Sequence, residues 1–147
     1  GEENKFSINR TFLSRSIRLE KLWLNNLNLN SSLLSKYFKF NLFKVLTNLD
    51  LSQNQLDYLS NDIFELNEYL TYLNLSSNLF KLFSLNIFYN REFLLYLDLS
   101  FNQIENILYE KESSYLFSKI DLRNNNLTLF NLDMITQISN LTYLDLS

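Results

Sequence analysis

The chain has 147 residues with 13 basic and 16 acidic side chains, which gives a net charge of −3. Cysteine and histidine are absent, which excludes a disulfide framework, a thiolate or imidazole metal site and a histidine-dependent nucleophile. The charge gives no electrostatic basis for binding nucleic acid or an anionic membrane. Hydrophobic residues make up 46% of the chain, enough for one packed domain and too many for a disordered chain.

The two ends of the sequence indicate part of a longer protein. Residues 1–5 are charged and no apolar stretch follows them, so they do not form an intact signal peptide. The single methionine is Met134, so the chain does not begin at an initiator. No apolar run reaches the ~18 residues of a membrane-spanning helix, and we expect no membrane contact by this segment itself.

A repeated pattern dominates the chain from residue 19 onward. Four segments read LxxLxLxxNxL with apolar exchanges, and their bounds are 46–56, 70–80, 94–104 and 117–127. An earlier copy over 19–29 keeps the leucines but has Leu27 in the Asn position, and residues 141–147 form the first half of another copy. We therefore predict one array: residues 1–18 as the tail of a preceding repeat, 19–140 as five repeats and 141–147 as the start of a sixth.

The middle of each copy predicts a short strand. Side chains alternate along a strand, so both leucines of each LxL point to the same side while the residues beside them face outward. A single repeat cannot bury its own leucine row, so neighbouring repeats must stack into a parallel sheet. An array that stops at residue 147 would leave Leu144 and Leu146 at an uncapped apolar end, so we expect further repeats in the whole protein.

The Asn position of each repeat predicts a structural ladder. The chain leaves the strand there and turns inward backbone N–H and C=O groups that need partners. A side-chain amide both donates and accepts, so stacked asparagines satisfy these groups. The predicted ladder consists of Asn54, Asn78, Asn102 and Asn125.

These segments, spaced by 24 or 23 residues, resemble leucine-rich-repeat proteins, in particular the 24-residue subclass found in extracellular receptors such as Toll-like receptors. Phe64 and Phe88 resemble the phenylalanine spine of that subclass. The resemblance implies an α/β solenoid, or horseshoe, with a parallel concave sheet and a convex side rich in loops and 3-10 helices. It further implies a module that binds a protein ligand, within a receptor or adhesion ectodomain at the cell surface.

Outward-facing strand residues are the candidate ligand-binding set. They form an acidic column beside an aromatic column, and aromatic side chains provide contact area while aspartates select basic partners. Alternatively, the aspartates have no binding role and only suit a solvent-exposed position where the strand leads into the turn, because Asp-Leu-Ser is common at this place in the family. The candidates are Trp23, Asp50, Tyr72, Asn74, Tyr96, Asp98, Phe101, Asp121, Tyr143 and Asp145.

Glycosylation sequons occur five times, close to the number that chance gives in a chain so rich in Asn, Ser and Thr. A glycan on Asn74 would stand on the concave sheet and block ligand around it. The candidate glycosylation sites are Asn9, Asn30, Asn74, Asn126 and Asn140.

Two other functions compete with the receptor hypothesis. An intracellular scaffold or adaptor agrees with the lack of cysteine and would place the chain in the cytoplasm. An enzyme is disfavoured: Asp98 and Asp121 would lie one strand apart, roughly 5 Å, but a flat exposed sheet has no pocket to raise a carboxyl pKa. The same regular carboxylates make a poor calcium site, so we predict no catalytic residue, metal or cofactor.

Overall fold

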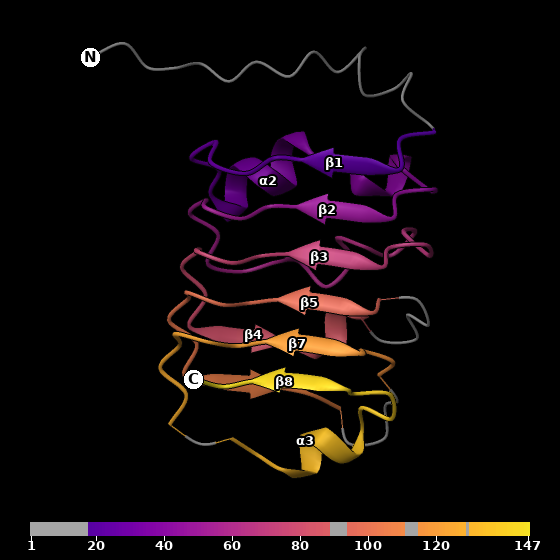
Figure 1. The fold of residues 1–147 in the computed structure, drawn as a ribbon. Coiled ribbons are helices and arrows are strands. Elements are labelled where there is room, and N and C mark those ends of the chain that lie inside the picture. Colours follow the sequence, from indigo (N-terminus) through magenta and orange to yellow (C-terminus); the bar gives the residue numbers. More distant parts are fainter. Residues whose placement is uncertain (1–17, 89–93, 111–114, 129) are drawn as a thin grey trace, which may run out of the picture.

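The computed structural model describes residues 18–147 except 89–93, 111–114 and 129. Most of the predicted tail over 1–18, and the sequon at Asn9, lie outside this part. Six short strands stack into one parallel sheet in the order β1-β2-β3-β5-β7-β8 (Figure 1). Their bounds are Lys21–Trp23 (β1), Asn48–Asp50 (β2), Tyr72–Asn74 (β3), Tyr96–Asp98 (β5), Lys119–Asp121 (β7) and Tyr143–Asp145 (β8).

Register along this sheet follows the sequence repeat without a slip. Leu49 pairs with Leu73, and Leu73 with Leu97, and all three side chains are fully buried. The second leucine of the inner LxL motifs, at Leu51, Leu75 and Leu99, is buried in the same way. Each such burial contributes roughly 1.5–3 kcal/mol. The α/β solenoid with a parallel sheet, predicted from the repeat, is confirmed.

Asparagines at the end of each strand bridge neighbouring repeats. The Asn78 amide nitrogen donates to the carbonyls of Leu75 in its own repeat and Leu51 in the preceding one, at 3.1 and 3.0 Å, while its oxygen accepts from the Leu56 N–H at 2.9 Å. Equivalent bonds are made by Asn54, Asn102 and Asn125. Buried backbone groups of one turn are therefore satisfied by an amide from the next repeat.

The turn of the first copy, where Leu27 replaces the asparagine, is completed in the same way. Asn54 accepts hydrogen bonds from the N–H groups of Leu27 and Leu29 at 3.1 and 3.0 Å. Asn26 and Asn28 both have positive φ in this turn, at 56° and 53°, a region that asparagine enters more readily than most residues. Asn26 shares its conformation with the equivalent residue of the later turns, such as Gln53, so Asn28 is the left-handed residue particular to this turn.

Segments between the strands form the opposite side of the solenoid, which we call the return side. It contains helices and a second, two-stranded parallel sheet of β4 and β6, which lies behind the main sheet (Figure 1). The elements are α2 (Ser31–Tyr37), the 3-10 helices η1 (Phe40–Leu42) and η2 (Leu85–Phe88), β4 (Leu82–Ser84), β6 (Asn106–Leu108) and α3 (Asp133–Thr136). The sequence did not predict the small sheet, nor that each repeat would return differently.

A row of phenylalanines packs between the two sides. Phe64 and Phe88 are 1% and 2% exposed, and their rings stack with centroids 6.0 Å apart. Phe40 continues the row on one side and Phe117 on the other, at 5.9 and 5.6 Å. This spine joins the dissimilar return segments into one core.

Within the described ranges, no helix is both long and apolar enough to cross a bilayer.

Candidate binding face

The outward side chains of the six-stranded sheet form a surface that we call the strand face. It is the surface predicted as concave from the repeat. Trp23 is 63% exposed and Phe101 56%, and Tyr143 is also exposed. In-register pairing of the strands aligns the remaining candidates in two columns across the sheet. One column is Tyr72–Tyr96 and the other is Asp50–Asn74–Asp98–Asp121–Asp145.

Two tyrosines stack at the centre of the strand face. The rings of Tyr72 and Tyr96 are nearly parallel, at 2°, with centroids 5.0 Å apart. Both are half-buried. Burial raises the pKa of Tyr96 to about 12, with further contributions from the carboxylate of Asp98 and from Tyr72. Burial, together with Asp50 and Asp98, also raises the pKa of Tyr72. The pair is a neutral aromatic platform flanked by carboxylates.

One oxygen of each acidic or amide side chain in the neighbouring column shapes the turn. Oδ1 of Asp50, Asn74 and Asp98 accepts from the N–H two residues later, at 2.8, 3.0 and 2.9 Å. These short local bonds are the ones that favour Asp and Asn where a strand leaves the sheet. The turn-forming alternative for this column thus has a structural basis. Oδ2 of Asp98 takes no part in these turn bonds, while Oδ2 of Asp50 accepts from the Asn74 amide at 3.4 Å.

Asp121 corrects the expectation that this column is exposed throughout. Its residue exposure is 2%, because the Arg123 side chain folds over it. Nη2 of Arg123 lies 2.7 Å from Oδ2 of Asp121, and Nε lies 3.6 Å from Oδ2 of Asp145. The hydrogen bond and charge of Asp121 raise the pKa of Arg123 above its ordinary value. Asp121 therefore belongs to an internal ion pair and not to an open binding surface.

Asp145 and Tyr143 complete this end of the strand face. The Tyr143 hydroxyl donates to Oδ2 of Asp145 at 3.0 Å, and the Ser147 N–H donates to Oδ1 at 3.0 Å. The bonds from Ser147 are the main cause that lowers the pKa of Asp145, and the bond to Asp145 is the main cause that raises the pKa of Tyr143. Both predicted candidates lie on the strand face and are bonded to each other there.

Phe101 occupies an unusual backbone position at the edge of the strand face. Its φ is 54°, as is common to the equivalent residues Gln53, Ser77 and Asn124, with φ between 53° and 55°. A left-handed conformation is unfavourable for a bulky residue and tolerated by asparagine. An exposed phenylalanine at this φ contributes neither burial nor turn stability, so local folding does not explain its presence.

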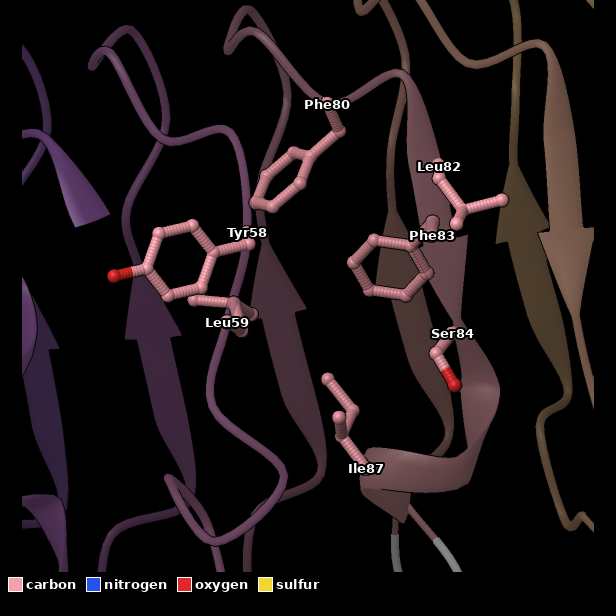
Figure 2. A pocket seen from close by; sticks show the side chains of 7 residues that line it. All are labelled: Tyr58, Leu59, Phe80, Leu82, Phe83, Ser84 and Ile87. Carbon is pink, nitrogen blue, oxygen red and sulfur yellow. The ribbon is translucent and has the colours of Figure 1, made fainter.

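Two hollows lie on the return side. The first, of about 130 Å³, is lined by Tyr58 and Leu59 from one repeat and by the β4–η2 segment of the next. Figure 2 shows the rings of Phe80 and Phe83 beside it. The second, of about 270 Å³, includes Lys39 and Asp62. Neither hollow is lined by a strand-face residue, so the carboxylates of the strand face have no pocket among these two.

Four of the predicted sequons fall within the described residues. Asn30, Asn126 and Asn140 are exposed, whereas Asn74 is half-buried between Asp50 and Asp98. Asn74 also donates weakly to Oδ2 of Asp50, at 3.4 Å. In addition, Asn30 caps helix α2, where its side chain accepts from the Leu33 N–H at 2.8 Å. No group of three or more acidic side chains that could hold a metal ion is present in the described ranges.

Comparison with solved structures finds a crystal structure of the leucine-rich repeat domain of APL1B. The match has 18% sequence identity and a TM-score of 0.52, and it covers 99% of this chain and 61% of that chain. The chain has the leucine-rich-repeat fold. It spans about three-fifths of that solved domain. No protein-family model and no curated protein matches the sequence.

Within this leucine-rich-repeat array, sequence reasoning missed the role of Arg123. The residue two positions after the acidic column is serine in most repeats, at Ser52, Ser76, Ser100 and Ser147. Asn25 and Arg123 are the exceptions, and Arg123 is the charged one, which the aligned repeats already show. Arg123 divides the strand face into a stretch over β7–β8 with internal ion pairs and a stretch over β2–β3–β5 where the described residues form none.

Proposed function

We propose that this chain is a non-catalytic protein-binding module that uses its strand face, as a segment of a receptor or adhesion ectodomain. The observation that carries the proposal is the set of exposed or half-exposed aromatic side chains on one face. Tyr72 and Tyr96 form a rigid stack, and Phe101 is exposed at a backbone position that disfavours it. Aromatic anchors of this kind dominate protein interfaces, and unfavourable local geometry is typical of functional positions.

Binding through the strand face is tested by two matched double variants. Tyr72→Ser with Phe101→Ser removes aromatic area from the strand face, while Tyr58→Ser with Leu82→Ser removes a similar area from the return side. Each immobilised chain is exposed to proteins from the source cells, and bound proteins are quantified by mass spectrometry. We expect partners of the unmodified chain to be lost from the first variant and kept by the second. Partners retained by the first variant would contradict the proposal.

The receptor assignment rests on the 24-residue spacing, which resembles extracellular members of the family, including Toll-like receptors. The alternative is an intracellular scaffold or adaptor, which the absence of cysteine supports. Expression of the chain through a secretory pathway tests the receptor assignment. Glycan mass on the exposed Asn126 or Asn140 would show only that these sequons are accessible, whereas no glycan at any sequon would weaken the receptor assignment.

A further inference from the structure

On the strand face, one basic side chain of the chain itself, Arg123, forms ion pairs with residues of the acidic column. Arg123 occupies the position that is serine in four of the other repeats and Asn25 in the first copy, and it extends its guanidinium along the acidic column. Its Nε lies 2.9 and 3.0 Å from the two oxygens of Asp121, and its contact with Asp145 crosses to the next strand. A guanidinium placed beside one column residue therefore reaches the column residue one strand later.

A related pair of column residues, with Asn74 in place of the first aspartate, lies over β3 and β5. Asn74 and Asp98 are paired across β3 and β5 as Asp121 and Asp145 are across β7 and β8. Ser76 stands where Arg123 stands, and its side chain is too short to cover the column. Asp98 is half-exposed, and its described bonds go to Ser100 through Oδ1 alone.

The aromatic stack beside Asn74 and Asp98 suits a guanidinium group. Tyr72 and Tyr96 lie two residues before Asn74 and Asp98 on the same strands and on the same face of the sheet. Guanidinium groups stack on aromatic rings and form bidentate bonds with carboxylates, which an ammonium group does less well. A ring and a carboxylate side by side thus complement arginine in shape as well as in charge.

Charges along the strand face confine this site to three strands. At the two outward positions of each strand, β2, β3 and β5 carry Asp50 and Asp98 and no basic residue, whereas Lys21 on β1 and Lys119 on β7 lie on either side. A cation is attracted to the middle of the face and repelled from its flanks.

We propose that the strand face binds an arginine side chain of a protein partner over β3 and β5. The guanidinium lies between Asn74 and Asp98 in the way that Arg123 lies between Asp121 and Asp145, and it stacks against Tyr96. This inference rests on the proposed function, and it specifies the chemistry of the partner residue at the centre of the interface.

The test is an NMR titration of the 147-residue chain with short capped peptides of one sequence that contain arginine, citrulline or lysine. We expect the arginine peptide to shift the ring signals of Tyr72 and Tyr96. Citrulline keeps the shape without the charge and should bind about fivefold or more weakly. Equal binding of the citrulline peptide, equal binding of the lysine peptide, or no shift of either ring would overturn the inference.

Variants locate the site. Asp98→Asn preserves the volume and the turn oxygen while removing the charge, and it should weaken the arginine peptide about fivefold. Ser76→Arg should fill the site from within the chain and abolish binding. The control Asp57→Asn removes an exposed charge from the return side and should leave binding unchanged. Unchanged binding in Asp98→Asn would overturn the inference even if Ser76→Arg failed to fold.

The double-variant experiment above keeps the two proposals apart. If the Tyr72→Ser/Phe101→Ser variant loses the partners but the arginine peptide does not bind the unmodified chain, the arginine proposal is wrong and binding through the strand face is supported. If that variant still binds the partners, the proposal that the strand face binds them is wrong.

Discussion

The strand side and the return side of this solenoid obey different constraints. On the strand side, the six strands of the main sheet keep one register, and the same asparagine recurs at each turn after the first. On the return side, α2 and η1 lie in one repeat and α3 in another, while two neighbouring repeats pair as β4 and β6, the first of which also contains η2. Both sides close the same core.

The contrast shows which physical requirement fixes local structure. The strand side must satisfy backbone hydrogen bonds along the whole stack, and one geometry does so. The return side must mainly place an apolar ring in the core, as Phe40, Phe64 and Phe88 do, and several backbone conformations achieve that. Substitutions that separate these two requirements give the following predictions, from the largest expected effect to the smallest.

Removal of a spine ring should be the most damaging change. Phe64→Ala leaves a cavity between two stacked neighbours and should lower the free energy of unfolding by about 3–5 kcal/mol. Urea denaturation followed by circular dichroism measures it. Leu66→Ala, at an exposed return-side position, serves as control and should change stability by less than about 0.5 kcal/mol. A loss in Phe64→Ala no larger than in the control would show that the spine does not join the two sides.

Loss of a ladder amide tests the strand side. Asn78→Leu keeps the volume but leaves buried groups of two repeats without partners, which should cost about 1–3 kcal/mol. The urea midpoint should fall accordingly. Asn61→Leu, on the exposed return side, provides the matched control. Equal midpoints for Asn78→Leu and the unmodified chain would refute the ladder.

Relief of the left-handed backbone at Phe101 should stabilise the chain. Phe101→Asn places a tolerant residue at φ near 54° and should raise the free energy of unfolding by about 0.5–1 kcal/mol. Asn124→Phe, at the equivalent turn, should do the opposite. If Phe101→Asn destabilises the chain, the phenylalanine has a folding role and its argument for binding weakens.

The smallest effect concerns the tyrosine stack at high pH. Because the pKa of Tyr96 is about 12 when folded and 10.0 is its ordinary value, the unfolded chain loses this proton first as pH rises. Stability should therefore fall between pH 10 and 12. In Tyr96→Phe the urea midpoint should fall less over this range than in the unmodified chain or in Tyr58→Phe. Identical pH profiles would contradict the buried environment of the stack.

Much of the strand side could be predicted from the sequence because its demands are chemical and periodic. A fixed spacing of leucines identifies the strands, and an amide recurring at one position identifies the ladder. The return side could not be predicted, because Leu82–Ser84 and Asn106–Leu108 pair as strands with no pattern that sets them apart from the helical returns. Asn67 likewise could not be predicted. Its buried amide donates hydrogen bonds to the carbonyls of Phe40 and Phe43, but no recurring position in the repeats points to this role.

The candidate site was predicted in its position but not in its electrostatics. The outward columns follow from alternation along a strand, so Tyr72, Tyr96 and Asp98 could be placed together from the sequence. Burial of Asp121 depends on a side chain two residues later that folds back over it, and the strand pattern says nothing of such a fold. The binding roles of these residues stay predictions until a partner is measured.

The asparagine ladder also implies an order in which the repeats fold during synthesis. The turn amide of Leu56 is bonded by Asn78, that of Phe80 by Asn102 and that of Ile104 by Asn125. During synthesis each turn emerges from the ribosome before the asparagine that completes it. Folding of the nascent chain therefore trails translation by about one repeat. The backbone groups of the most recently synthesised turn stay exposed to water until the next asparagine has been added.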